Sequence, residues 1–428
     1  MAQVHVIGAG LAGLSCAVRL TQRGFNVALY EAAPQAGGRC RSFFDAGLER
    51  VIDNGNHLIL GANDGVMGYL DTIGADRALT TAPEEALPFL DLRTGERWAL
   101  RPNGGPLPWW LFVPGRRVPD SRPGQYLAAL ALRRAGPDAT IADVMDIHGP
   151  LFERLWKPII VAVLNTPVDQ ASARLMWPVM ALIFGRGAVA CRAFAAREGL
   201  SAGLVDPALA WLAERGCQAA FGHRLRAMEM ADGRTTALRF GDHGVDLGAA
   251  DSVVLAVPPA RAADLIPGLE TPLGNRPIVN AHYRLPSPAS LPEGSPLLGL
   301  IGGQAEWVFL RGDVASVTVS AADHLIDTPS EDIASLLWAD VAQALDKASQ
   351  PLPPHRIVKE RRATFDQTPA EAVRRPPART ATANLYLAGD WTDTGLPATI
   401  ESAIHSGCAA AEAIASSSPQ RVGPRNAR

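Results

Sequence analysis

The chain has 428 residues, of which 47% are hydrophobic, and this length predicts two domains that each bury a hydrophobic core. Its 40 basic and 43 acidic side chains give a net charge of −3, so no excess of positive charge is available for binding nucleic acid. The five cysteines are scattered and lack the spacing of metal ligands, which predicts a reduced, cytoplasmic location and no metal site.

Residues 4–7 are predicted to form an apolar strand that leads into a Gly-x-Gly-x-x-Gly turn and a helix. Gly8 permits the tight bend, Gly10 lets a pyrophosphate approach the backbone, and Gly13 lets the helix pack closely on the strand. The helix N-terminus offers free N–H groups and a partial positive charge to phosphates. The turn therefore predicts a dinucleotide site, with a plain βαβ unit as the alternative.

A second strand is predicted at 26–30, and it ends at Glu31. An acid at this position suits the ribose hydroxyls of an adenosine. A second glycine turn, Gly37-Gly38-Arg39, suits a backbone that passes beside phosphates, with the arginine as the charge partner. An ordinary hairpin turn with a solvated arginine is the alternative for this second turn.

Residues 61–195 alternate helical patterns with proline-rich breaks and are expected to form a helical cap. The longest apolar runs in the chain, such as 175–184, are too short to cross a bilayer, so any membrane contact is expected to be peripheral. Trp109 and Trp110, which precede two arginines, form a candidate membrane-interface anchor. A buried aromatic plug is the alternative reading of the two tryptophans.

The second half of the chain returns to α/β character. A helix is predicted at 200–215, short strands around 224–226 and 236–240, and a buried strand at 252–257. From 275 to 365 strands dominate, which predicts a second sheet. Its predicted strands are 278–285, 307–310, 315–320 and 358–365, with one helix at 333–345. A strand that ends in Gly389-Asp390 and a helix at 399–414 close the fold, and the polar tail from 416 is expected to be disordered.

Four segments, taken together and in this order, resemble the FAD-dependent amine oxidase/phytoene desaturase superfamily. They are the first glycine turn with Glu31, the Gly37-Gly38-Arg39 turn, the strand at 253–259, and the stretch 387–407. The resemblance implies an α/β fold in which a Rossmann-like FAD-binding domain of the glutathione-reductase-2 type is interleaved with an α+β substrate domain. The implied parts are the FAD-binding domain at 1–60, 196–262 and 380–415, the helical cap at 61–195, the substrate sheet at 263–379, and the tail at 416–428.

Within that superfamily, several segments resemble the hydroxysqualene dehydroxylases of bacterial hopanoid synthesis. The segments are 30–42, 52–57, 153–158, 164–167, 199–201 and 205–208. The resemblance implies that hydroxysqualene, a hydrophobic C30 isoprenoid, and reduced FAD give squalene, water and oxidised FAD. It also implies a cytoplasmic protein, with peripheral contact to the inner membrane as an option. The chain has one dinucleotide fingerprint, so the electron donor to FAD is external and unidentified.

The resemblance assigns cofactor roles residue by residue. Glu31 matches the ribose acid, Arg39 the arginine along the cofactor, and Leu225 the strand residue whose backbone meets the adenine. Asp390 matches the carboxylate on the ribityl–phosphate side, and the helix that opens at Thr399-Ile400 faces the flavin pyrimidine. No cysteine matches a flavin-linking position, so FAD is expected to be non-covalent. The expected cofactor-binding residues are Gly8, Gly10, Gly13, Leu14, Glu31, Gly37, Gly38, Arg39, Leu225, Gly389, Asp390, Thr399 and Ile400.

The implied reaction needs a hydride, a general acid for the departing hydroxyl, and a dry cavity. Asp53 and His57 are the candidate catalytic acids, because the family places their segment near the cofactor. Asn165 and Thr166 could orient the hydroxyl or could simply end a helix. Further acid candidates, each with a supporting role as the alternative, are Glu401, His405 and Asp393.

Three other functions compete with this one. A polyprenoid desaturase or isomerase would share the fold, the FAD and an apolar tunnel. An amine oxidase is disfavoured because the strand at 278–285 carries no lysine and no tyrosine is apparent around Trp391. A non-catalytic prenyl-binding protein is disfavoured by the intact glycine turn, Glu31 and Asp390.

Overall fold

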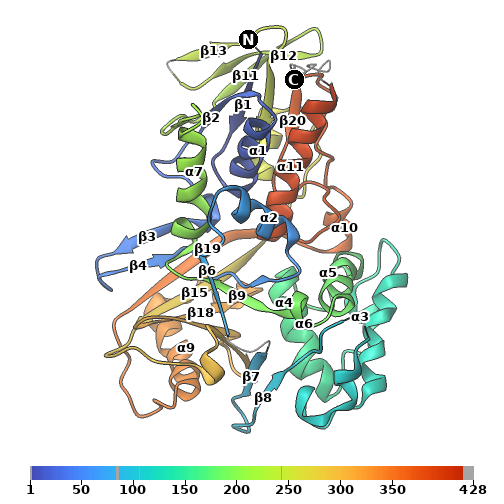
Figure 1. The fold of residues 1–428 in the computed structure, drawn as a ribbon, viewed down its shortest axis with the longest axis vertical. Coiled ribbons are helices and arrows are strands. Elements are labelled where there is room, and N and C mark those ends of the chain that lie inside the picture. The colour runs from blue at the N-terminus through green and yellow to red at the C-terminus, as the bar shows by residue number, and fades with distance from the viewer. Residues whose placement is uncertain (1, 83–85, 106, 242, 418–428) are drawn as a thin grey trace, which may run out of the picture.

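The computed structural model describes residues 2–82, 86–105, 107–241 and 243–417. Two sheets organise this part of the chain (Figure 1). A five-stranded sheet occupies the end of the molecule that holds the start of β1 and the end of α11, and a seven-stranded sheet lies toward the other end. Helices cover both sheets, so the α/β fold predicted from the sequence is confirmed.

The five-stranded sheet is Rossmann-like, because all its neighbouring strands run parallel in the order β10-β2-β1-β14-β20. Its strands are rich in valine and largely buried, as expected for a parallel sheet covered on both faces. Its strands are β1 (Gln3–Ile7), β2 (Asn26–Tyr30), β10 (Ala219–Ala220), β14 (Ser252–Leu255) and β20 (Leu385–Leu387), and the helices packed nearby are α1 (Leu11–Gln22), α7 (Asp206–Ala213) and α11 (Ile400–Ser417).

The first and last helices of this layer pack without a gap. A Cβ atom on Gly407 of α11 would collide with the Ser15 hydroxyl and the Ala12 carbonyl of α1. The Ser15 hydroxyl donates to the carbonyl of Ile404 at 3.2 Å, which fixes the two helices side by side. This contact joins the beginning of the chain to its end.

The seven-stranded sheet has the order β19-β15-β18-β17-β16-β7-β8, antiparallel except for the β16–β7 pair. One face packs on α9 through an apolar cluster, and the other face joins the cluster formed by the 109–185 region. The elements are β7 (Leu87–Asp91), β8 (Arg97–Leu100), β15 (Asn275–Arg284), β16 (Leu297–Ile301), β17 (Trp307–Arg311), β18 (Val314–Val319), β19 (His355–Phe365) and α9 (Ser330–Ala344).

Residues 61–195 are less helical than the sequence predicted, because they also supply strands. Pro88 lies inside β7, and proline normally argues against a strand, so the pattern concealed β7 and β8. A further strand of this region, β6 (Leu79–Thr81), and β5 (Ile59–Leu60), which lies just before the region, flank β9 (Ala193–Ala196). The helices are α2 (Asp64–Thr72), α3 (Ile141–Val144), α4 (Lys157–Leu164), α5 (Ala173–Gly185) and α6 (Ala188–Cys191), with 3-10 turns at Trp109–Phe112, Pro114–Arg116 and Pro123–Arg134.

Several predicted boundaries shift. The helix predicted at 200–215 begins with a π-helical turn at Ser201–Val205, and a second π-helical turn, Phe152–Trp156, precedes α4. Residues 224–226 are irregular, and the strand starts at Ala227. The last helix extends through Ser417, and the rest of the predicted tail lies outside the described residues. The remaining elements are β3 (Ser42–Asp45), β4 (Arg50–Asp53), β11 (Ala227–Ala231), β12 (Arg234–Arg239), β13 (Gly244–Asp246), α8 (Pro259–Leu265) and α10 (Pro369–Ala372).

Within the described ranges, every helix is too short or too polar to span a bilayer.

Candidate active site

Three of the predicted cofactor segments start at the same edge of the five-stranded sheet. Gly8 follows β1, Glu31 follows β2, and Gly389 lies two residues beyond β20. Because these strands are parallel, their carboxyl ends point the same way, and ligands of such sheets bind beside this edge.

The first glycine turn has the shape that a pyrophosphate requires. Gly8 has φ +110°, and a Cβ atom there would collide with the carbonyl oxygen of Ala256. A Cβ on Gly13 would collide with the carbonyl oxygen of Gly8. Nothing lies within 4 Å of a Cβ built on Gly10, so the turn leaves open space where the backbone faces outward. The residues present therefore fit a dinucleotide phosphate.

Leu14 does not fit the cofactor role expected for it. Its side chain is fully buried in the core beneath the turn. Its backbone N–H already donates to the carbonyl of Gly10 at 2.9 Å. Leu14 therefore supports the helix from below and presents no free group to a ligand.

Glu31 joins the second strand to the glycine turn. One carboxylate oxygen accepts the N–H of Ala9 and the other accepts the N–H of Ala33, both at 2.8 Å. The Gly37 N–H donates to the Ala9 carbonyl at 2.8 Å, so the second glycine turn lies against the first. The carboxylate is thus held beside the turn, where its remaining lone pairs can accept ribose hydroxyls.

Leu225 lies next to Glu31, although the strand predicted around it begins two residues later. The N–H of His223 donates to the Glu31 carbonyl at 2.8 Å. The Leu225 carbonyl accepts from the Arg261 guanidinium at 2.8 Å, and its side chain is buried. The segment that carries Leu225 therefore lies beside Glu31.

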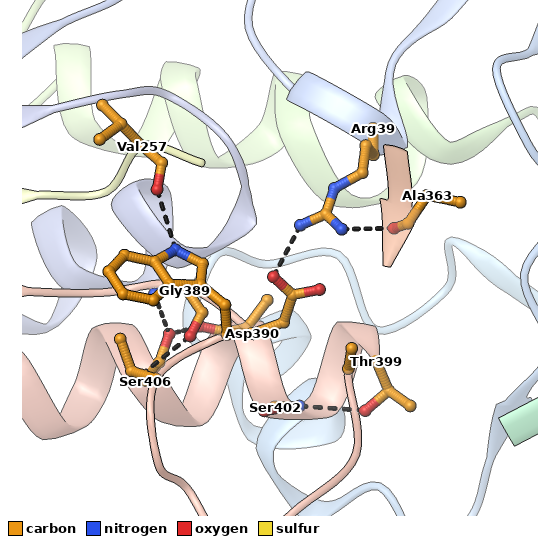
Figure 2. A network of polar contacts seen from close by, with 12 residues as sticks. Arg39, Val257, Ala363, Gly389, Asp390, Thr399, Ser402 and Ser406 are labelled. Carbon is orange, nitrogen blue, oxygen red and sulfur yellow. Dashed lines mark hydrogen bonds and ion pairs between the residues drawn. The ribbon is translucent and has the colours of Figure 1, made fainter. Parts of the chain in front are cut away.

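An ion pair joins the two ends of the site (Figure 2). The Arg39 Nη2 atom lies 2.7 Å from the Asp390 Oδ1 atom, and its Nη1 atom donates to the carbonyl of Ala363 in β19. The Asp390 carboxylate is buried, whereas the Arg39 side chain is 44% exposed. Asp390 raises the pKa of Arg39 further above its ordinary value. The pair links the N-terminal segment, the seven-stranded sheet and the C-terminal segment.

The loop after β20 is fixed on both sides. The Gly389 N–H donates to the Ser406 hydroxyl at 2.8 Å, and the Trp391 indole N–H donates to the Val257 carbonyl at 2.9 Å (Figure 2). Gly389 has φ +149°, which an L residue rarely adopts. The loop therefore has one position relative to β14 and α11.

Thr399 begins the last helix. Its hydroxyl accepts the N–H of Ser402 at 3.2 Å, which satisfies one of the free donors of the first turn (Figure 2). Ile400 is the first residue of α11. A helix N-terminus at this point favours negative charge nearby, as a reduced flavin pyrimidine carries.

Arg375 organises the same loop, and no sequence motif pointed to it. The guanidinium donates to the carbonyl oxygens of Leu396 at 2.8 Å and Asp390 at 3.1 Å, and also to that of Thr392. The side chain is buried, and burial lowers the pKa of the guanidinium below its ordinary value. Arg375 therefore places a buried positive charge against the loop that forms the candidate flavin end of the site.

Gln367, also without a sequence signal, ties this loop to the cap. Its Oε1 atom accepts the Ala398 N–H at 2.8 Å, and its Nε2 atom donates to the carbonyl of Leu164, the last residue of α4, at 2.7 Å. Its own N–H donates to the Thr166 hydroxyl at 3.2 Å. Thr166 thus takes part in a structural junction, and it is not aimed at a ligand.

Asn165 has a similar structural role. It has φ +47° and ends α4, and its amide donates to the Thr364 hydroxyl at 3.0 Å and the Arg276 carbonyl at 3.2 Å. Its Oδ1 atom accepts the Ala321 N–H at 2.6 Å. Every polar atom of the amide group is therefore engaged with the sheet.

Asp53 is buried and fully engaged. Its Oδ2 atom pairs with Arg311 at 2.7 Å, and its Oδ1 atom accepts from the Ser42 hydroxyl at 2.6 Å and the Leu200 N–H at 2.9 Å. Both carboxylate oxygens of Asp53 are therefore occupied by contacts within the protein.

His57 lies on the loop after β4, with its Nε2 atom 4.0 Å from the Cys40 sulfur. Burial lowers the pKa of His57 to about 4, so the ring is neutral near pH 7. The structure thus brings His57 to the Arg39 segment, but in a form that lacks the charge of a strong proton donor.

The three further acid candidates have supporting contacts. The Glu401 carboxylate accepts the N–H groups of Gly65 and Val66 at 2.8 and 2.9 Å, at the start of α2. His405 hydrogen-bonds Glu401 at 2.9 Å, and this bond raises the pKa of His405. Asp393 accepts the N–H of Gly395 at 3.2 Å within its own loop.

Replacing Glu31 by alanine should weaken retention of FAD at least about tenfold, because two charge-assisted hydrogen bonds that shape the turn are lost. The dissociation constant is measured by flavin fluorescence on reconstitution of the apoprotein. Glu214→Ala, at an exposed position, is the control and should bind FAD normally. If both variants retained FAD equally well, Glu31 would not be part of the FAD site.

Residues 11–415 match the family described as flavin containing amine oxidoreductase. The chain is 48% identical to hydroxysqualene dehydroxylase of Rhodopseudomonas palustris, covering 96% of this chain and 98% of that protein. It is 44% identical to hydroxysqualene dehydroxylase of Sinorhizobium fredii, covering 96% and 97%. An oxidoreductase from Methanosarcina mazei shares the fold, with a TM-score of 0.71 at 14% identity over 96% of this chain and all of that one.

These matches confirm the resemblance seen in the sequence and the FAD cofactor predicted from it. The chain belongs to the flavin-containing amine oxidoreductase family and, within it, to the hydroxysqualene dehydroxylases.

Proposed function

We propose that this protein is an FAD-dependent enzyme that removes the hydroxyl group of hydroxysqualene reductively and releases squalene and water. The observation that carries the proposal is the Arg39–Asp390 pair, which assembles both ends of an FAD site in a chain of this family. FAD, when bound, supplies the hydride. The protein must then bind an isoprenoid, place its hydroxyl group and provide a proton.

FAD is held without a covalent bond in this proposal. Cys40 is the cysteine next to Arg39, and burial raises its pKa to about 12. A thiol that keeps its proton is a poor nucleophile toward a flavin.

The apolar wall of the substrate site is the face of the seven-stranded sheet that meets the cap. Phe89 stacks on Trp98 at 5.6 Å and meets Trp307 edge to face at 5.7 Å. All three belong to, or pack on, the apolar cluster shared with the cap. Aromatic ring faces stabilise positive charge, so this wall suits a chain that develops cationic character at carbon.

Polar side chains also lie on that face of the sheet. Thr318 is the cross-strand neighbour of Trp307, and its hydroxyl donates to the Asn280 Oδ1 atom at 2.8 Å. The Asn56 amide reaches the same hydroxyl at 3.1 Å. An aromatic wall beside an amide–hydroxyl cluster suits a hydrocarbon substrate that carries a hydroxyl group. We assign Asn56, Asn280 and Thr318 to positioning that group.

Glu306 is the proton donor in this proposal, in place of Asp53 and His57. Burial raises its pKa to about 7, so a large share of the carboxyl keeps its proton near neutrality. Its Oε2 atom accepts the Ser320 N–H at 2.8 Å, and the next N–H, of Ala321, donates to Asn165 at the end of α4. Glu306 thus lies close to the junction of sheet and cap. Asp53 and His57 support the loop that carries Asn56.

The function is tested by anaerobic incubation of the enzyme with reduced FAD and hydroxysqualene, with product analysis by gas chromatography and mass spectrometry. Squalene is expected, in an amount equal to the FAD oxidised. Heat-treated enzyme controls for uncatalysed loss of water. Desaturated polyenes without squalene would contradict the proposal and favour a polyprenoid desaturase.

Replacing Glu306 by glutamine should lower kcat by about 10²- to 10⁴-fold, because the amide cannot donate a carboxyl proton. In the unchanged enzyme the acid form is active, so kcat should fall as pH rises through about 7, the pKa of Glu306. The variant should lack this dependence while retaining FAD. Glu270→Gln, at an exposed position, is the control. An unchanged pH profile in Glu306→Gln would exclude this residue as the acid.

We also propose that the cap contacts a membrane surface peripherally. Leu107, Phe112, Leu127 and Leu130 are 55–76% exposed, and Trp109 is 50% exposed with Arg116 over its ring at 5.0 Å. Trp110 is buried, so the two predicted roles of the tryptophan pair are divided between its members. Exposed apolar side chains beside arginines suit the interface of an anionic bilayer, from which a C30 isoprenoid is drawn.

Replacing Trp109 and Phe112 together by alanine should lower binding to phosphatidylglycerol vesicles at least about tenfold, because each large side chain contributes roughly 1.5–3 kcal/mol when it leaves water. Binding is measured by vesicle co-sedimentation. Phe44→Ala, 64% exposed on β3 and remote in sequence from the cap, is the matched control. Equal binding by both variants would contradict a membrane role for the cap.

A further inference from the structure

A groove of about 370 Å³ lies between the β3–β4 hairpin and the edge strand β19. Gln35, Arg41, Phe43, Asn54 and residues 356–359 line it. The volume is in the range of small-molecule sites. None of the roles assigned above uses this groove.

The walls of the groove are continuous with the cofactor site. Arg41 lies two residues after Arg39, which pairs with Asp390. Asn54 precedes the loop that carries His57, and its N–H donates to the Arg41 carbonyl at 3.0 Å. Along β19, the groove residue Lys359 is four residues from Ala363, a separation of about 14 Å in a strand. A molecule in the groove would therefore lie next to the chain segment that carries Arg39.

The charges in the groove favour an anion. Arg41 and Arg356 are directed by single contacts, to the Gly38 carbonyl at 2.8 Å and to the Asp45 carboxylate at 3.6 Å. Glu360, the nearest carboxylate on β19, is held by the Asn54 amide at 3.1 Å. Neither Asp45 nor Glu360 is among the residues that line the groove.

An aromatic side chain also lines the groove, beside the positively charged residues. Phe43 is half-buried in the groove, and the Gln35 and Asn54 amides can donate hydrogen bonds. Arginine binds phosphate through paired N–H groups, and an aromatic side chain stacks on a planar ring. The groove thus combines the contacts that a phosphate-bearing heteroaromatic nucleotide requires.

We propose that this groove binds the reductant of the enzyme, a reduced nucleotide that carries a phosphate and a planar hydride-donating ring. The proposal rests on the function proposed above, because a reductive dehydroxylase must be reduced again after each turnover. The balanced step is NADPH + H⁺ + FAD → NADP⁺ + FADH₂, or FMNH₂ + FAD → FMN + FADH₂ where the donor is a reduced flavin mononucleotide. Arg41 and Arg356 hold the phosphate, and Phe43 faces the ring.

Binding is tested by titrating the holoenzyme with NADP⁺ and with FMN in a calorimeter, and reduction by mixing it anaerobically with NADPH or reduced FMN in a stopped-flow spectrometer. One of the two nucleotides should bind and reduce the flavin. The double variant Arg41→Gln/Arg356→Gln should bind it at least about tenfold more weakly. Arg133→Gln/Arg134→Gln, on the cap, is the matched control and should bind normally.

If the double variant loses FAD, the same titration is made with the single variant Arg356→Gln, which should also bind the nucleotide more weakly. Failure of both nucleotides to bind, or equal binding by the groove variant and the control, would overturn the proposal. Reduction by an acidic iron–sulfur protein alone would overturn it as well. Enzyme reduced with dithionite and given hydroxysqualene tests the proposed function separately, because that reaction bypasses the groove.

Discussion

The buried carboxylate of Asp390 is the group on which the candidate site depends. Removing a carboxylate from water is costly unless a partner compensates for the loss, and Arg39 is that partner. The same arginine binds Ala363 of β19, and Arg375 binds the main-chain oxygen of Asp390. One ionic contact therefore requires the N-terminal turn, the substrate sheet and the C-terminal loop to be assembled together, so a complete FAD site exists only in the folded chain.

A second constraint connects this cofactor end to the cap. Gln367 has no exposed surface, and it bonds at once to Ala398 beside α11 and to Leu164 at the end of α4. Asn165 anchors the same helix end to the sheet. The cap is thus anchored at a fixed point beside the aromatic face of the sheet. Several apolar side chains of the cap, among them Leu107 and Phe112, are exposed.

The sequence predicted the features that are set by local chemistry. Gly8 and Gly13 are required because a Cβ at either position would collide with the backbone, and such glycines are recognisable in a motif. Most strands of both sheets followed from their apolar runs, as did α9 and α11. Strands β7 and β8 were missed because Pro88 masks the pattern and pairing with β16 stabilises them. Arg375, Gln367 and Glu306 were missed because their roles come from contacts with distant segments. The motif also did not show that the Leu14 side chain is buried, because a motif does not show which way a side chain points.

The central claim is that hydride from FAD replaces the hydroxyl group of an isoprenoid held under the cap. The most direct test is a single anaerobic turnover of the reduced enzyme in D₂O, where the exchangeable flavin hydrogen is deuterium. The account predicts squalene that carries one deuterium at the carbon that bore the hydroxyl group. Squalene without deuterium, or a product that has lost water without gaining hydrogen, would contradict it.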